Sequence, residues 1–320
     1  MALLQVNYVS QALMHQVALN VILPVDEFAS ESSPYRPERK FPTLYLLHGL
    51  LGNYEDWVTG TRVKRWAETH GLAVVMPSGD NHFYVDQPAT HELYGHFIGC
   101  ELVEMTRRMF PLSRRWEDTF IGGLSMGGYG ALRNGLKYAD TFSHIAALST
   151  ANIVTRMDFF SDDAPNFNQR TAYLEALFGP RGGIPGSDND LSALARGLKG
   201  SPRKPKLYLA CGDQDSLLPL NLQLKQELEA DGFDLTWRQA PGGHEWDFWD
   251  SQIRQVIDWL PLAEDGSGMN SGNVGRQLSC RQARHTKNAH KNRQPAVKFP
   301  PAAGFIFGAA LPGEGAVRRL

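Results

Sequence analysis

The sequence lacks the features of several large classes of protein. Three cysteines in 320 residues, at positions 100, 211 and 280, cannot make a disulfide framework and do not show a metal-binding spacing. A net charge of −2 gives no reason to expect nucleic acid or a membrane surface as a partner. No apolar run approaches transmembrane length, and the first residues do not resemble a secretory leader. We therefore expect a protein of the reducing cytoplasm.

Short apolar runs alternate with helical patterns along residues 1–263. Several runs are continuously apolar, which is typical of parallel strands buried on both faces. Their alternation with helices predicts an α/β domain with a mostly parallel sheet and helices on both faces. Two strands joined by a very short loop should pair antiparallel at one edge. The expected strands are 3–9, 17–23, 43–47, 72–76, 119–121, 144–149, 206–211 and 233–239; the expected helices are 53–57, 62–70, 94–110, 129–138, 172–178, 191–198, 217–230 and 246–260.

Two segments depart from this alternation. Residues 151–205 are too long for a plain connection between strands, and we expect them to form a cap or lid, because long insertions are usually functional. Residues 264–320 hold nine Lys or Arg against three Asp or Glu, with little periodicity. They could be a basic arm for an anionic partner, but their scattered charges favour a disordered extension. We predict one domain over 1–263, followed by this tail.

A G-x-S-x-G motif, with Ser125 at its centre, lies between a β-type run and a helical segment. Strand, sharp turn and helix in that order form the setting of a nucleophile elbow. The glycines suit a strained turn, and the following helix directs its positive end at the place where an oxyanion would form. The motif alone fits a glycine-rich turn without chemistry equally well, so the rest of the site must decide.

Two later loops supply an acid and a base, each after a strand. Asp213 and Asp215 follow the strand that ends at 211, and His244 follows the strand that ends at 239. The carboxyl ends of parallel strands meet at one edge of the sheet, so these residues can converge on Ser125. We predict His244 as the base that activates the serine. The spacing from Gly212 favours Asp215 as the acid, which leaves Asp213 as a turn residue bonding its own backbone.

A fourth part follows the strand at 43–47. His48, Gly49 and Leu50 resemble the HG-type loop of lipases and esterases, which donates a backbone N–H to the oxyanion. We expect the N–H groups of Leu50 and Met126 to form the oxyanion hole, each worth about 3 kcal/mol in the transition state. His48 itself should only brace the loop. Phosphate-loop, dinucleotide-binding and HExxH zinc motifs are missing, so we expect neither cofactor nor metal.

Together these motifs resemble the esterase D family of α/β-hydrolases, in particular its bacterial tributyrin-esterase branch. Relatives in that family include S-formylglutathione hydrolases, feruloyl and acetyl esterases, and secreted mycolyltransferases. The resemblance covers roughly residues 2–262 and implies Ser125 as nucleophile, Asp215 as acid, His244 as base, and Leu50 and Met126 as oxyanion donors. It is carried by 46–53 with Trp57, 76–77, 83–86, 123–131, 212–215, and 242–246 with Trp249.

The resemblance implies a serine carboxylesterase that hydrolyses short-chain acyl esters through an acyl-enzyme. S-formylglutathione hydrolase is the alternative, although residues 50–53 lack the cysteine usual in that branch. An acyltransferase and a non-catalytic binding module are further alternatives. Tyr84, Asp86, Trp246 and the insertion are candidates for contacting the small-molecule ester. The residues leave open whether the protein forms a homo-oligomer.

Overall fold

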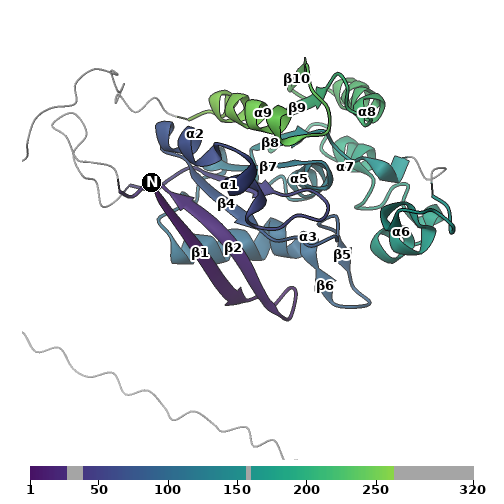
Figure 1. Cartoon of the computed structure of the whole chain (residues 1–320), viewed down its shortest axis with the longest axis horizontal. Helices are drawn as coiled ribbons and strands as arrows, with labels where there is room; N and C mark the ends of the chain where they lie inside the picture. Colours follow the sequence, from purple (N-terminus) through teal and green to yellow (C-terminus); the bar gives the residue numbers. More distant parts are fainter. Residues whose placement is uncertain (27–38, 156–159, 263–320) are drawn as a thin grey trace, which may run out of the picture. The chain divides into compact units, whose positions relative to one another are not determined.

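An eight-stranded sheet organises the protein, as seen in a computed structural model that describes residues 1–26, 39–155 and 160–262 (Figure 1). The predicted tail at 264–320 lies outside the described residues, which all belong to one compact unit. The order across the sheet is β1-β2-β4-β3-β7-β8-β9-β10. These strands are β1 (Ala2–Val9), β2 (Gln16–Leu23), β3 (Thr43–Leu47), β4 (Ala73–Pro77), β7 (Thr119–Leu124), β8 (His144–Leu148), β9 (Lys206–Gly212) and β10 (Leu235–Ala240).

Strand β2 alone runs against its neighbours. It pairs antiparallel with β1 at the edge and with β4 on its other side, and the remaining pairs are parallel. The prediction of a mostly parallel sheet with an antiparallel edge is therefore confirmed. Because β3, β7, β8, β9 and β10 run in the same direction, the loops that follow them lie at one edge of the sheet.

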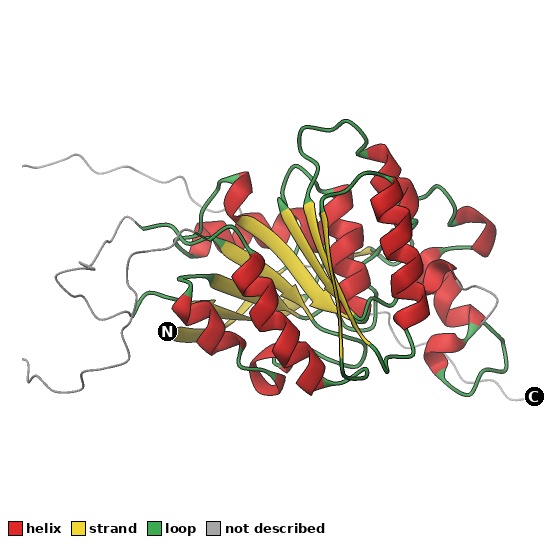
Figure 2. Cartoon of the chain, turned by 90° about the horizontal axis from the view of Figure 1, so that it is seen from above, coloured by secondary structure: helices red, strands yellow, loops and turns green. Residues whose placement is uncertain are grey.

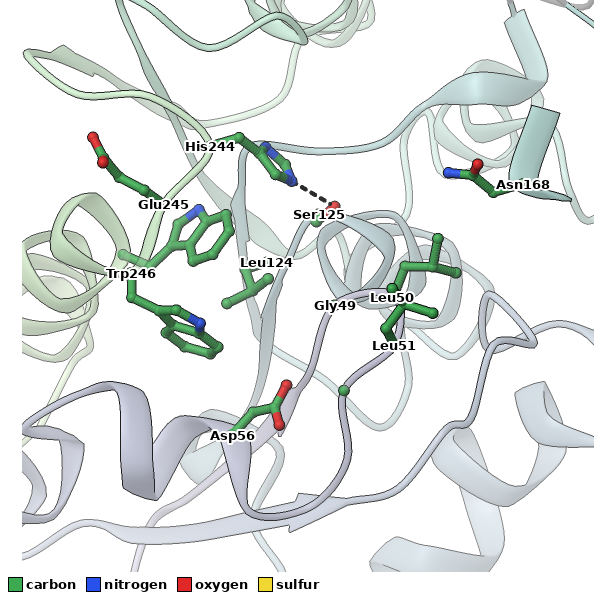
Figure 3. A pocket seen from close by; sticks show the side chains of 12 residues that line it. Gly49, Leu50, Leu51, Asp56, Leu124, Ser125, Asn168, His244, Glu245 and Trp246 are labelled. Carbon is green, nitrogen blue, oxygen red and sulfur yellow. Dashed lines mark hydrogen bonds between the residues drawn. The ribbon is translucent and has the colours of Figure 1, made fainter. Parts of the chain in front are cut away.

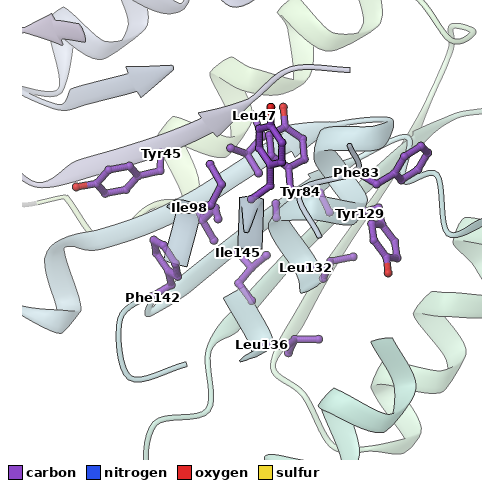
Figure 4. Close-up of a cluster of buried hydrophobic side chains, with 14 of the residues drawn as sticks. Tyr45, Leu47, Phe83, Tyr84, Ile98, Tyr129, Leu132, Leu136, Phe142 and Ile145 are labelled. Carbon is purple, nitrogen blue, oxygen red and sulfur yellow. The ribbon is translucent and has the colours of Figure 1, made fainter. Parts of the chain in front are cut away.

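Helices cover both faces of the sheet, as predicted, and Figure 2 shows the strands between them. Alternate residues of β3 enter different cores: Tyr45 and Leu47 belong to the hydrophobic core on one face of the sheet, and Leu44 and Leu46 belong to the core on the other face. Figure 4 shows part of the first core. The helices are α1 (Asp56–Gly60), α2 (Val63–Thr69), α3 (Tyr94–His96), α4 (Leu102–Met109), α5 (Met126–Lys137), α6 (Thr171–Phe178), α7 (Leu191–Gly197), α8 (Leu218–Ala230) and α9 (Trp246–Trp259). Across the described ranges, none of the helices has the length and apolar character needed to span a bilayer.

The helix predicted over 94–110 is present and contains a π-helical turn. A π-helical turn, Phe97–Glu101, separates α3 from α4, after the two short strands β5 (Asp86–Gln87) and β6 (Glu92–Leu93). The carboxylate of Glu101 accepts hydrogen bonds from the backbone N–H groups of Gln11 (3.0 Å) and Ala12 (2.7 Å). The helix is thus fastened to the β1–β2 turn by a tertiary contact, which apolar spacing within 94–110 does not reveal.

The insertion at 151–205 contains the two predicted helices, α6 and α7, with 3₁₀ turns at Ile153–Thr155, Phe167–Gln169 and Arg181–Gly183. Phe178 at the end of α6 packs edge-on against Phe83 and Tyr129 of the main body, with ring centroids 5.4 and 5.8 Å apart. The insertion is therefore packed on the domain through aromatic contacts. That it acts as a lid stays a prediction.

We expect stability to fall between pH 6.5 and 4 because of His144. Its ring lies edge-on against Phe120 and Trp259, and burial, with help from the charge of Lys206, lowers its pKa to about 4. The unfolded chain, with an ordinary histidine pKa near 6.5, takes up this proton first as the pH falls. The neutral ring's contribution is complete above pH 6.5 and is lost on acidification, by about 1–2 kcal/mol after allowance for its partial exposure.

Urea unfolding of the wild type and of His144→Phe, at several pH values from 7 to 4, checks this expectation. The phenylalanine keeps the aromatic packing and cannot titrate, so its unfolding free energy should fall less steeply below pH 6.5. Identical slopes for the two proteins would contradict the role given to His144.

Candidate active site

The elbow places Ser125 at the point where β7 becomes α5. Its φ is +55° and its ψ is −117°, a strained conformation that costs on the order of 1–3 kcal/mol. The N–H of Ser125 donates to the carbonyl of Leu148 (2.8 Å), and its carbonyl accepts from Ala151 (3.1 Å), so bonds to the end of β8 hold the turn. A Cβ at Gly127 would lie 2.4 Å from the carbonyl oxygen of Leu47. Glycine is therefore required there for close packing.

His244 lies between Ser125 and Asp215. Its Nε2 is 2.9 Å from the Ser125 hydroxyl, and its Nδ1 is 2.9 Å from Oδ2 of Asp215 (Figure 3 shows the first contact). The other oxygen of Asp215 accepts from the N–H of Leu217 (2.9 Å). Of the two acids that the sequence offered, the structure brings Asp215 to the histidine.

Asp213 points elsewhere. It is exposed, and its Oδ1 accepts from the N–H of Gly242 at 3.3 Å, in the loop that carries His244. The expectation that Asp213 bonds its own turn is wrong: Asp215 makes the bond within the turn, and Asp213 bonds the neighbouring loop. Asp213 thus supports the loop that carries His244 and is not part of the hydrogen-bonded series Ser125–His244–Asp215.

The charge on Asp215 is stabilised by its hydrogen bonds. Burial alone would raise the pKa of this carboxyl, but bonds from His244, from the Leu217 N–H and from Ser149 outweigh it and hold the pKa below its usual range. Asp215 is therefore ionised at neutral pH. An ionised carboxylate keeps a proton on Nδ1 of His244 and leaves Nε2 free to accept the serine proton.

The loop after β3 approaches Ser125 from the other side. Gly49 and Leu50 line the same cavity as Ser125, and Met126 is the first residue of α5, where helix N–H groups have no partner within the helix. His48 is buried; its Nδ1 is 2.6 Å from the carbonyl of Gly49, and its Nε2 accepts from the N–H of Gly79 (2.8 Å). Burial lowers the pKa of His48. A neutral His48 thus braces the loop, the role expected from the sequence.

Two predicted substrate contacts are corrected by the structure. Tyr84 is fully buried, and its hydroxyl donates to the carbonyl of His48 (3.0 Å). Asp86 pairs with Arg133 (3.2 Å) and Lys137 (3.3 Å) of α5. Burial would raise the pKa of Asp86, but these cations and the His96 N–H keep it low. Both side chains are committed to the fold and neither lines the cavity, whereas Trp246, the third candidate, does.

Tyr84→Phe tests this correction. Loss of the hydroxyl leaves the carbonyl of His48 without its buried partner, which should lower the free energy of unfolding by about 1–3 kcal/mol. We expect kcat to fall while KM for an aryl ester stays within twofold. Denaturant unfolding and steady-state kinetics measure both effects, and a large rise in KM alone would restore Tyr84 as a substrate contact.

Ser125 opens into a cavity of about 650 Å³. Figure 3 shows Trp246 and Asn168 on different sides of it, the latter contributed by the insertion. Among the described residues that line the cavity, Asp56 and Glu245 are acidic, and there is neither lysine nor arginine. Nowhere in the described part of the chain do three or more metal-ligating side chains gather in a possible metal site. The lining is Gly49, Leu50, Leu51, Gly52, Asp56, Leu124, Ser125, Asn168, His244, Glu245, Trp246 and Trp249.

Sequence reasoning missed the residues behind the acid. Ser149 bonds Asp215, and its hydroxyl oxygen accepts from the indole N–H of Trp249 (3.1 Å), whose ring packs edge-on against His244. Burial and the charge of Asp215 raise the pKa of the neighbouring Cys211 thiol to about 12. Ser149 directly follows a strand at the active edge, a signal that could have identified it. Asp215 and Trp249 belong to motifs found in the sequence, but their bonds to Ser149 join residues far apart in the sequence and could not be predicted.

Comparison with known proteins agrees with this geometry. Residues 10–260 match the Esterase family model, described as "Putative esterase". An acetyl esterase from Caldicellulosiruptor saccharolyticus is 41% identical over 266 residues, which cover 83% of this chain and all of that protein. The serine hydrolase FphF of Staphylococcus aureus, described as fluorophosphonate-binding, has a TM-score of 0.70 at 30% identity, covering 81% of this chain and 98% of that one. An S-formylglutathione hydrolase from Staphylococcus aureus has a TM-score of 0.68 at 30% identity, with the same coverage.

The fold is that of the α/β-hydrolases, and the protein is a serine carboxylesterase, an enzyme that hydrolyses carboxylic ester bonds. The chain belongs to the Esterase family, and the expected likeness to esterase D and its relatives is confirmed.

Proposed function

We propose that Ser125 is the nucleophile of this esterase, with His244 as its general base and Asp215 as the acid that orients it. The observation that carries the proposal is the position of His244, 2.9 Å from the Ser125 hydroxyl and 2.9 Å from the Asp215 carboxylate. Distances of this size allow the proton to pass from oxygen to nitrogen as the serine attacks.

The proposed reaction has two halves. Ser125 attacks the acyl carbonyl and passes its proton to Nε2 of His244, and the negative charge on the carbonyl oxygen is held by the N–H groups of Leu50 and Met126. The imidazolium then protonates the leaving alcohol, so that an acyl-enzyme remains on Ser125. Water, deprotonated by His244, releases the acid and restores the serine. These residues complete both halves, and we propose that neither metal nor cofactor takes part.

We further propose short-chain esters of alcohols that carry no negative charge, acetyl esters among them, as substrates. Support for the short acyl group comes from the relative named acetyl esterase, whose whole length is matched by this chain. Support for an alcohol without negative charge comes from the cavity, where Asp56 and Glu245 are the acidic lining residues among those described. Their carboxylates disfavour an anionic substrate by like-charge repulsion.

S-formylglutathione is the second candidate substrate, because the solved S-formylglutathione hydrolase is 30% identical to this chain. Glutathione carries a net negative charge at neutral pH, and the cavity lining offers it no cation among the described residues. The charge argument therefore favours the neutral ester over this thioester.

A panel of aryl esters of graded acyl length, together with S-formylglutathione and an aryl hemisuccinate, tests the proposal. We expect kcat/KM to be highest for acetyl to butyryl esters and lower for both anionic compounds. Glu245→Gln should narrow the gap between neutral and anionic esters, and Ser125→Ala is the inactive control. A preference for S-formylglutathione over every neutral ester would overturn the substrate class, and activity in Ser125→Ala would overturn the nucleophile.

We also propose that the enzyme works in the cytoplasm as a hydrolase of small molecules. The support is the free state of Cys100 and Cys211, which suits a reducing compartment. Fractionation of cells that express the full chain, followed by detection with an antibody, would test this location, and recovery outside the cytoplasmic fraction would contradict it.

A further inference from the structure

The proposed oxyanion donor Leu50 lies in a strained turn. The N–H of Gly52 donates to the carbonyl of Gly49 (3.2 Å), which closes a four-residue turn with Leu50 and Leu51 at its centre. Leu51 has a φ of +67°, a conformation that favours glycine or asparagine at the third position of a turn. Its side chain is 75% exposed, so packing does not hold it there. His48 braces the carbonyl of Gly49 at the start of this turn, and a second contact holds the strained Leu51 itself.

That contact comes from the loop after β4. Oδ1 of Asn81 accepts the N–H of Leu51 at 2.8 Å. On the other side of the donor, the carbonyl of His48 accepts the hydroxyl of Tyr84 at 3.0 Å. The peptide that carries the Leu50 N–H is therefore flanked by two peptides, each held by a residue of the same neighbouring loop. Preorganised donors of this kind stabilise an oxyanion because they need not reorient during the reaction.

Asn81 also contacts the insertion. Its main-chain carbonyl accepts the hydroxyl of Tyr173, in α6, at 2.5 Å. One residue thus bonds the oxyanion loop through its side chain and the insertion through its backbone. The insertion reaches the active site a second time through Asn168, which lines the cavity.

We propose that Asn81 is a positioning residue that fixes the oxyanion hole and couples its geometry to the insertion at 151–205. The proposal rests on the role given to the Leu50 N–H above. Asn81 does not line the cavity, so it acts through Leu51 and its removal should affect the transition state more than substrate binding.

Kinetics of Asn81→Ala, Tyr173→Phe and their double variant, with an aryl acetate, test this role. We expect Asn81→Ala to lower kcat about tenfold, less than the 10²–10³-fold cost of losing a whole oxyanion donor, with KM within twofold. Tyr173→Phe should lower kcat about threefold. The double variant should match Asn81→Ala, because Tyr173 acts through Asn81 and the two effects are not additive.

The inhibition constant of a transition-state analogue distinguishes a positioning role of Asn81 from a purely structural one, which would leave this constant unchanged. An aryl trifluoromethyl ketone forms a tetrahedral adduct with the serine, and its inhibition constant should rise by the same factor as kcat/KM falls. Asn53→Ala is the matched control: it removes the same type of side chain two residues beyond Leu51, where the side-chain oxygen of Asn53 accepts the N–H of Glu55 and does not bond the Leu50–Leu51 turn. This variant should keep kcat and the inhibition constant unchanged.

The proposal is overturned if Asn81→Ala keeps kcat within twofold, if it raises KM alone, or if Asn53→Ala loses as much. Additive losses in the double variant would overturn the coupling to the insertion. Thermal unfolding shows whether each variant is folded. If Asn81→Ala does not fold, the kcat and inhibition constant of Tyr173→Phe decide whether the proposal holds. Ser125→Ala is measured alongside these variants. If Ser125→Ala is inactive while Asn81→Ala is as fast as the wild type, only the role of Asn81 is wrong. If Ser125→Ala is active, the proposed nucleophile is wrong.

Discussion

Ser125→Ala is expected to lower kcat/KM for an aryl acetate by about 10⁵-fold or more, because loss of the nucleophile removes the acyl-enzyme route altogether. The alanine fits the same backbone position, so near-UV circular dichroism and the melting temperature should stay close to those of the wild type. Ser251→Ala, which removes an exposed serine on α9, is the matched control and should keep full activity. A Ser125→Ala enzyme that retains more than a few per cent of activity would place the chemistry elsewhere.

Asp215→Asn is expected to lower kcat/KM by about 10⁴-fold, whereas Asp213→Asn should lower it by less than about tenfold. An amide at position 215 would present an N–H to Nδ1 of His244 and favour the wrong tautomer. At position 213 the amide oxygen can still accept from the N–H of Gly242. The two variants differ from the wild type by the same chemical change, so each is the control for the other.

Initial rates of aryl acetate hydrolysis at pH 8 distinguish the two aspartates. Each variant replaces one carboxylate by an amide, so a difference in rate reflects the contact that each carboxylate makes. A larger loss for Asp213→Asn would show that Asp215 serves the fold and that His244 is oriented by the other carboxylate. Comparable losses would mean that the loop position, and not the Asp215 contact, controls His244.

The elements of the sheet could be predicted because their physical cause is local. A strand buried on both faces must be continuously apolar, as 43–47 and 72–76 are, and these runs became β3 and β4. The start of α5 was predicted three residues late, since Gly127 and Gly128 are poor helix formers. Gly127 packs against the end of β3 and Gly128 against the end of β8, and helix propensity does not report such contacts.

The residues of the proposed active site could be predicted as far as strand order dictates them. Ser125, Asp215 and His244 each follow a parallel strand, so one rule brings them to the same edge of the sheet. That rule does not say which way a side chain points. Tyr84 and Asp86 also lie near this edge, but their partners, His48 and Arg133, turn them into the protein interior.

The insertion shows the same limit. Its two helices, predicted over 172–178 and 191–198, are both present as α6 and α7. The placement of Asn168 against the cavity and of Tyr173 against Asn81 depends on how the whole segment packs, through Phe178 on Phe83 and Tyr129. Such contacts join residues that are distant in the sequence, and the pattern of any one segment does not contain them.

Labelling with a fluorophosphonate probe, followed by mass spectrometry of the digested protein, tests the central claim most directly. An activated serine attacks the phosphorus, fluoride leaves, and the phosphonyl group stays on the serine oxygen, so the added mass should appear on the peptide that contains Ser125. Labelling should be lost in Ser125→Ala and strongly slowed in His244→Ala, and it should remain in Ser251→Ala. A probe mass on a different residue, or labelling of Ser125→Ala at the wild-type rate, would contradict the account.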